Sequence, residues 1–182
     1  MEERAVILVE GVSDRIAVEA LAERRGRDLR GEGVSVVPIG GAQALGRFLE
    51  RFGADVRLAG LCDAGEERDF ARALERAGLG IDLTRADMEA LGFYVCEADL
   101  EDELIRALGA DRVEQIVEAH GDLRPLRTLQ KQAAWNGRPL EHQLRRFMGS
   151  GGSRKLKYAR LLVEALEPAQ VPRPLDLVLT HV

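Results

Sequence analysis

Residues 5–14, Ala5-Val-Ile-Leu-Val-Glu-Gly-Val-Ser-Asp14, join a short apolar run to an acidic turn. The run Ala5–Val9 is apolar at every position, which predicts a strand buried on both faces. Ile16, Val18 and Leu21 then recur at helical spacing, and Ser13 is expected to cap this helix. A buried strand leading straight into a helix is the first unit of a parallel sheet.

The same unit repeats along the first half of the chain. Further apolar runs at 34–39, 56–62 and 93–96 predict three more strands, and helical spacing at 44–49 and 70–77 separates them. The repetition predicts an α/β fold with a four-stranded, mainly parallel sheet flanked by helices. Tight turns would then place Glu10, Gly40 and Asp63 at the carboxyl ends of strands, where open sheets bind ligands.

From residue 99 onward the pattern is helical. Helices are expected at about 100–108, 113–117, 123–135, 140–148 and 154–166, and residues 175–182 fit either a strand or a helix. We expect residues 1–110 to form the α/β core. Residues 111–182 would form a basic helical cap and a C-terminal tail packed on that core, within one compact domain.

Composition places the chain among soluble globular proteins. It has 182 residues, of which 46% are hydrophobic and 31% charged, which excludes disorder, collagen-like repeats and a disulfide scaffold. The longest apolar run has five residues, far fewer than the roughly 20 that cross a bilayer, and the acidic start is unlike a signal peptide. We therefore expect a cytoplasmic protein without membrane contact. Cys62 and Cys96 lack a CxxC partner and are expected to be reduced, buried thiols.

Charge is divided unevenly along the chain. The net charge is −5, but residues 1–123 carry a balance of −12, whereas residues 124–160 carry ten basic residues and one acidic residue. An acidic region can hold cations, and a basic region can hold phosphates, so this division favours a metal-dependent enzyme that acts on a polyanion. The alternative is a solvated helical surface with a chance charge bias.

Acidic residues follow the predicted strands. Glu10 and Asp63 come directly after apolar runs, Asp14 lies one turn beyond Glu10, and Asp99 and Glu101 follow the fourth run. Oxygen ligands without a histidine cluster favour Mg²⁺ or Mn²⁺ over Zn²⁺. For any single acid in this set, helix capping is a competing explanation.

These elements, in this order, resemble a known family. Val9-Glu-Gly11 with Ser13-Asp14, then Pro38-Ile-Gly-Gly41 and a strand ending in Asp63, resemble the Toprim domain of topoisomerases, primases and nucleases. Residues 98–104, Ala-Asp-Leu-Glu-Asp-Glu-Leu, and residues 153–159, Ser-Arg-Lys-Leu-Lys-Tyr-Ala, resemble specifically the OLD (overcoming lysogenization defect) nuclease type. The resemblance spans roughly residues 5–167 and implies a Toprim, Rossmann-like fold with a C-terminal helical extension.

The chain departs from the family pattern at two points. Toprim proteins generally carry Asp-x-Asp after the third strand, whereas this chain has Asp63-Ala-Gly65. Glu66 or Glu67 would replace the missing acid only if the turn returns it to the site, and the resemblance implies that Asp99 and Glu101 can compensate. The chain also lacks a GxxxxGK[ST] motif, so an ATPase would come from a separate protein in trans or would not be used.

The resemblance implies a divalent-metal-dependent nuclease that cleaves phosphodiester bonds of DNA by a two-metal mechanism. Glu10 and Asp63, aided by Asp14, would hold one Mg²⁺ or Mn²⁺, and Asp99 and Glu101 the second. Glu10 would also serve as the general base or general acid of the reaction. Lys155 is the candidate to stabilise charge on the scissile phosphate, with Lys157 as the alternative, although both lysines also fit a solvated helix start.

Candidate contacts to the nucleic-acid backbone come from the basic region: Arg124, Arg127, Lys131, Arg138, Arg145, Arg146, Arg154, Lys157 and Arg160. Trp135 lies among them and either stacks on an exposed base or packs into the core. Two other functions stay open at this point. One is an RNA-processing Toprim nuclease acting on structured RNA, and the other is a catalytically silent module that binds nucleic acid or a protein partner.

Overall fold

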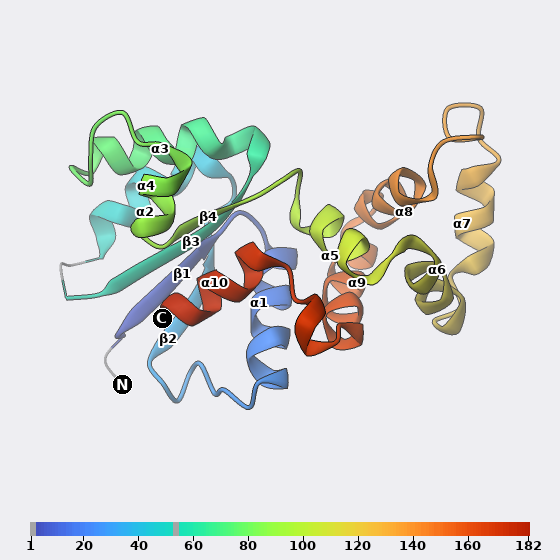
Figure 1. The fold of residues 1–182 in the computed structure, drawn as a ribbon, viewed down its shortest axis with the longest axis horizontal. Helices are drawn as coiled ribbons and strands as arrows, with labels where there is room; N and C mark the ends of the chain where they lie inside the picture. The colour runs from blue at the N-terminus through green and yellow to red at the C-terminus, as the bar shows by residue number, and fades with distance from the viewer. Residues whose placement is uncertain (1–2, 53–54) are drawn as a thin grey trace.

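The computed structural model describes residues 3–52 and 55–182 and contains a four-stranded parallel sheet (Figure 1). Its strands are β1 (Ala5–Val9), β2 (Val34–Pro38), β3 (Arg57–Asp63) and β4 (Phe93–Cys96). They lie in the order β2-β1-β3-β4, and all three neighbouring pairs are parallel. The predicted α/β class is thus confirmed, with a sheet that is wholly parallel.

Two cores form, one on each face of the sheet, because side chains alternate along each strand. On β1, Val6 and Leu8 enter one core, and Ala5, Ile7 and Val9 enter the other. The first core is covered by α2 (Leu45–Arg51), α3 (Glu67–Arg76) and α4 (Arg85–Ala90). The second is covered by α1 (Val12–Arg24) and by the C-terminal helices. This double coverage explains why β1 is apolar at every position.

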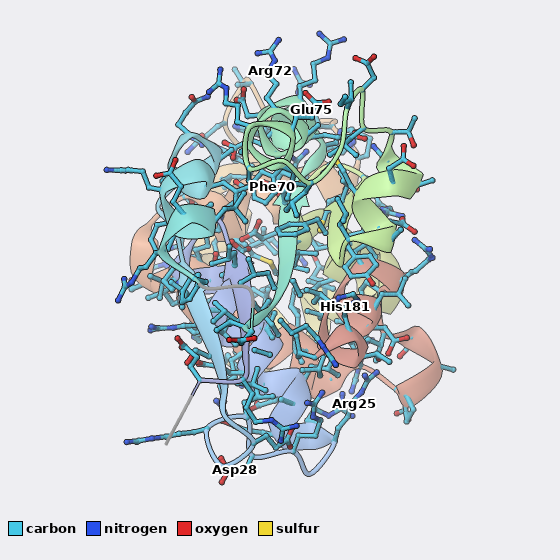
Figure 2. The ribbon with its side chains drawn as sticks, turned by 90° about the vertical axis from the view of Figure 1, so that its left-hand side faces the viewer. Arg25, Asp28, Phe70, Arg72, Glu75 and His181 are labelled. Carbon is cyan, nitrogen blue, oxygen red and sulfur yellow. The ribbon has the colours of Figure 1, made fainter. Side chains whose placement is uncertain are left out.

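Aromatic packing fixes the first core. Phe70 of α3 points toward the sheet, and Arg72 of the same helix points away from it (Figure 2). The Phe70 ring meets the Phe93 ring edge-on, with centroids 6.4 Å apart. Position 60 on β3 must be glycine here, because a Cβ atom would lie 2.4 Å from the Phe93 ring. Cys62 enters this core, whereas Cys96 enters the other, and both are buried and free as predicted.

The start of α1 differs from the sequence expectation. The helix begins at Val12 with Gly11 as its N-cap residue, and Ser13 is buried inside the first turn. The Asp14 carboxylate accepts a 2.8 Å hydrogen bond from the Gly11 N–H and so closes the turn. An acidic group in the first turn also stabilises the positive end of the helix.

The second half of the chain is helical. It contains α5 (Leu100–Leu108), α6 (Ala110–Ala119), α7 (Leu123–Gln130), α8 (Leu140–Gly149), α9 (Gly152–Ala165) and α10 (Arg173–His181). The helices α6, α7 and α8 lie beyond the sheet, whereas α9 packs on α1 and α10 returns to β3 and β4 (Figure 1). Residues 175–182, which fitted either structure in the sequence, are therefore mainly helical. The predicted boundary at residue 110 falls at the start of α6 and stays a prediction.

The helix predicted at 123–135 ends five residues early. After Gln130 the chain forms turns, in which the Trp135 N–H donates to the Gln132 carbonyl at 2.8 Å. Gly137 has a φ of 75°, a conformation that favours glycine, and Pro139 precedes α8. No helix within the described ranges is long and apolar enough to cross a membrane.

Candidate active site

Three carboxyl groups meet at the carboxyl edge of the two central strands. Glu10 follows β1, and Asp63 ends the neighbouring strand β3. A Glu10 carboxylate oxygen accepts a 2.7 Å hydrogen bond from the backbone N–H of Asp63. Asp14 stands one helical turn beyond Glu10, and repulsion from it raises the pKa of both other carboxyl groups. The pattern of acids after strands has therefore brought these three residues together.

Glu66 joins this group, which answers the question that the sequence left open. The 3-10 turn η2 (Ala64–Glu66) directs the Glu66 side chain back to Glu10, where its charge helps to raise the pKa of Glu10. Glu66 also accepts a 3.0 Å hydrogen bond from the Ala42 N–H, at the end of the Gly40-Gly41 loop. Glu67 points elsewhere and binds Arg85, whose Nε lies 3.0 Å from its carboxylate. We call Glu10, Asp14, Asp63 and Glu66 the sheet-edge acids.

Burial and mutual repulsion disfavour the charged forms of three of the sheet-edge acids. Desolvation is the largest cause in each case, and it raises the pKa of Glu10 to about 7, that of Asp14 to about 6 and that of Asp63 to about 8. Repulsion from neighbouring carboxylates adds to each rise. Across the part of the chain that the structure describes, no Arg or Lys forms an ion pair with any of the four. This cluster is therefore short of positive charge.

Asp99 and Glu101 lie beside this cluster, but basic residues already neutralise them. Asp99 is the N-cap residue of α5, accepts from the Asp102 N–H at 2.8 Å, and pairs with Arg145 of α8 at 2.6 Å. Glu101 is buried in the first turn of α5 and pairs with Lys155 of α9, with an Nζ–Oε1 distance of 3.1 Å. We call Asp99 and Glu101 the α5 acids.

The donor atoms match a hard divalent cation in type and charge. All are carboxylate oxygens, and a cation would offset the repulsion that raises the pKa values of the sheet-edge acids. As they stand, no three His, Cys, Asp or Glu side chains in residues 3–52 and 55–182 are placed to bind one ion. A bound cation would thus have to draw these carboxylates closer together.

Six of the nine predicted nucleic-acid contacts are engaged within the protein. Arg145 pairs with Asp99, Arg127 with Glu114, Lys157 with Asp122, and Arg160 with both Glu23 and Glu164. Arg154 donates to the carbonyl oxygens of Phe147 and Ser150 and so fixes the turn between α8 and α9. Arg138 donates from Nε to the Ala134 carbonyl oxygen at 2.8 Å. For the other three, no ion pair forms with any described residue: Arg124, Lys131 and Arg146.

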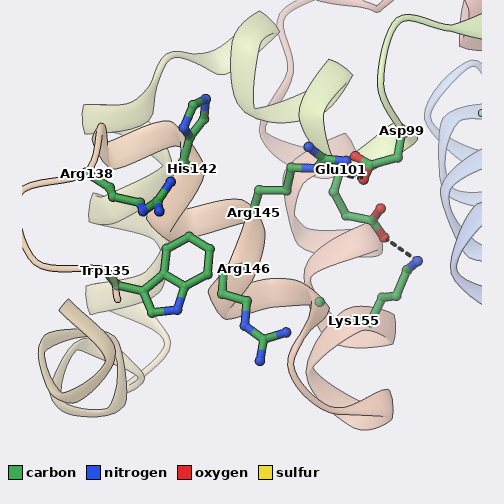
Figure 3. A pocket seen from close by; sticks show the side chains of 9 residues that line it. Asp99, Glu101, Trp135, Arg138, His142, Arg145, Arg146 and Lys155 are labelled. Carbon is green, nitrogen blue, oxygen red and sulfur yellow. Dashed lines mark hydrogen bonds and ion pairs between the residues drawn. The ribbon is translucent and has the colours of Figure 1, made fainter. Parts of the chain in front are cut away.

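A pocket of about 410 Å³ links the α5 acids to the basic region (Figure 3). The side nearest the sheet contains the ion pairs Asp99–Arg145 and Glu101–Lys155. The far side contains Trp135 and Arg138, with Arg146 between the two sides. His142 and Gly149 complete the lining. This pocket was not predicted, because it depends on how α8 packs against α5 and α9.

Comparisons with known proteins agree with this description. Residues 3–62 match the family described as "Overcoming lysogenization defect protein-like, TOPRIM domain". The chain is similar to a solved structure of the C-terminal region of the Xanthomonas campestris pv. campestris OLD protein. The alignment covers 99% of this chain and 92% of that one, with 23% sequence identity and a TM-score of 0.76. The alignment with the same region of the Burkholderia pseudomallei OLD protein covers 100% of this chain and 97% of that one, with 19% sequence identity and a TM-score of 0.73.

No curated protein sequence matches the chain. At these identities, the structural matches establish the fold. Together with the match over residues 3–62, they confirm the resemblance to the OLD-type Toprim domain that the sequence indicated.

Proposed function

We propose that this protein is a divalent-metal-dependent nuclease that cleaves phosphodiester bonds of DNA. The observation that carries the proposal is the cluster of Glu10, Asp14 and Asp63, whose half-buried carboxyl groups form no ion pair within the described residues. Strongly raised pKa values in a cluster at the ligand-binding edge of a parallel sheet are typical of a functional site.

The sheet-edge acids would hold one Mg²⁺ or Mn²⁺, and the α5 acids would hold a second once Arg145 and Lys155 move to the substrate. When bound, such ions make water nucleophilic and neutralise charge on the phosphate. The need to exchange Arg145 and Lys155 for a cation distinguishes the second position from the first.

The protein's own residues supply proton transfer and positive charge. Glu10 has one carboxylate oxygen bound to the Asp63 N–H and a pKa of about 7, so it can take up or release a proton near neutral pH. Lys155 would donate from Nζ to the scissile phosphate, since an ammonium group suits a point contact. Arg145 and Arg146 would hold the neighbouring phosphates.

A pair of adjacent variants tests the site. Glu66→Gln removes a charge beside Glu10, whereas Glu67→Gln makes the same change in a residue that faces Arg85. We expect purified protein with Mn²⁺ to nick supercoiled plasmid, Glu66→Gln to lose most of this activity, and Glu67→Gln to keep it. If the two variants lost nicking activity equally, Glu66 would not belong to the active site. Cleavage of structured RNA but not plasmid would favour the RNA-processing alternative.

A second candidate, a catalytically silent binding module, is favoured by one observation. Lys155 and Arg145 occupy the carboxylates that the second ion would need, and Gly65 stands where Toprim enzymes carry an acid. Saturable Mn²⁺ binding without cleavage of plasmid or structured RNA would support this function over the nuclease.

A further inference from the structure

We propose that the pocket between Trp135 and the α5 acids receives an unpaired nucleobase, stacked on the Trp135 ring, and so selects single-stranded ends or gaps in the nucleic acid. This inference rests on the proposed function, because it assigns the substrate feature that the same site recognises. Three features of the molecule support it: the contacts that hold Trp135, the positive charge of the pocket lining, and the position of the pocket beside the α5 acids.

Trp135 is held in place although it lies outside regular secondary structure. Its carbonyl oxygen accepts a 2.9 Å hydrogen bond from the side chain of Gln143, which is buried on α8. Gln143 in turn accepts a 2.9 Å hydrogen bond from Gln130 at the end of α7. The ring packs against the edge of the second core and still lines the pocket. A fixed, half-buried ring loses little freedom when a base stacks on it.

Two guanidinium groups flank the indole. Arg138 and Arg146 lie 5.6 and 6.0 Å from its ring centroid, close to the outer limit of about 6 Å for cation–π contacts. Neither group forms an ion pair with a described residue. Arg138 binds the Ala134 carbonyl oxygen through Nε, which leaves its terminal nitrogens, and the Arg146 guanidinium, for the phosphates on either side of a stacked base. An aromatic platform beside basic side chains is typical of single-strand recognition.

The pocket as a whole is positive and leads to the candidate active site. Its lining carries four basic side chains against two carboxylates, and its volume of about 410 Å³ lies within the usual range for small ligands, about 300–1,000 Å³. Asp99 and Glu101 form its inner side (Figure 3). A strand whose base is held at Trp135 could therefore run across the pocket toward Lys155. A paired base inside a duplex could not reach the ring, because its faces are covered by stacking.

The chain contains one tryptophan, so fluorescence excited selectively in tryptophan reports on this pocket alone. With EDTA present to prevent cleavage, we expect a short oligothymidylate to quench the fluorescence saturably. An abasic strand of equal length should leave the fluorescence unchanged and bind about tenfold more weakly, because it keeps the phosphates and lacks the stacking bases. Equal quenching by the two strands, or none by either, would overturn the inference.

Variants refine the assignment through the anisotropy of a labelled oligothymidylate. Trp135→Phe should keep affinity within about threefold, whereas Trp135→Ala should lose about tenfold. Arg138→Ala should weaken binding, whereas Arg30→Ala, which changes an exposed arginine outside the pocket, should not. If both alanine variants at Trp135 and Arg138 bind as wild type, the base lies elsewhere. Thermal unfolding of each variant checks that it is folded.

The outcomes separate this inference from the nuclease proposal. Base-dependent quenching without Mn²⁺-dependent cleavage would support the pocket and refute the nuclease. Cleavage without base-dependent quenching would support the nuclease and refute the pocket.

Discussion

The sheet-edge acids and the α5 acids lie side by side, yet they are neutralised in opposite ways. Burial and repulsion raise the pKa values of Glu10, Asp14 and Asp63, which disfavours their charged forms. Asp99 and Glu101 instead form ion pairs with Arg145 and Lys155. The first group would release protons when a cation arrives, whereas the second must exchange one cation for another. Proximity alone thus does not make carboxylates equivalent as ligands.

The largest expected effect comes from Glu10→Gln, which removes one charge from the sheet-edge acids while keeping the size of the side chain. We expect Mn²⁺-dependent plasmid nicking to fall about a thousandfold or more, because both ion binding and proton transfer are lost. Binding of an oligonucleotide in EDTA should change little. Nicking at the wild-type rate would show that the reaction does not depend on the sheet-edge acids.

Lys155→Met tests the α5 acids, because it removes the ion-pair partner of Glu101. Single-turnover cleavage should fall about 10- to 100-fold through loss of a charge near the phosphate. Mn²⁺ should bind more tightly by calorimetry, since Glu101 no longer has a competing partner. Lys157→Met is the matched control, because Lys157 pairs with Asp122 instead. Unchanged Mn²⁺ affinity in Lys155→Met would mean that Glu101 is no ion ligand.

Asp63→Asn tests the protonation of the sheet-edge acids through stability. In the metal-free native state the pKa of Asp63 rises from 3.8 to about 8, so the native state keeps a proton that the unfolded state has released. Native stability should therefore fall as the pH rises through this window.

The asparagine variant cannot ionise and should escape this fall. Relative to wild type it should gain on the order of 2 kcal/mol by pH 8, since the partly exposed carboxyl is screened by solvent. Thermal unfolding at pH 5 and pH 8 measures the gain. Added Mn²⁺ should stabilise wild type more at pH 8 than at pH 5. A stability difference independent of pH would contradict the raised pKa.

The smallest expected effect comes from Arg146→Ala, which changes a basic residue of the pocket and is compared with a change in Arg160, which is already ion-paired. Arg146→Ala should reduce the slope of log affinity against log salt by about 0.9 on duplex DNA, because one phosphate contact is lost. Arg160→Ala should leave the slope unchanged, since Arg160 binds Glu23 and Glu164. Equal slopes for wild type and both variants would show that Arg146 makes no contact with a phosphate.

The sheet and its central acids followed from local sequence signals. The apolar run Ala5–Val9 and the acids directly after β1 and β3 predicted both the fold and the meeting of Glu10 with Asp63. Parallel strands end at one edge, so spacing along the chain translates directly into position.

Contacts between distant segments could not be predicted in the same way. Glu66 is held by Ala42, 24 residues earlier, and Asp99 by Arg145, 46 residues later. Each contact depends on how a turn or helix packs rather than on the sequence around it. The pocket beside Trp135 belongs to this class as well, because three helices must meet to form it.

The return of α10 to β3 and β4 has a consequence for the order of folding. Arg27 binds the carbonyl oxygens of Leu179 and Val182, and Arg57 binds that of His181, so the last helix is tied to residues near the start of the chain. The sheet cannot be fully covered during synthesis until residues 173–181 have left the ribosome. Contacts of such long sequence separation slow folding, and the nascent chain would expose β3 and β4 meanwhile. All candidate active-site residues, the last of which is Lys155, would therefore leave the ribosome before the helix that covers this face.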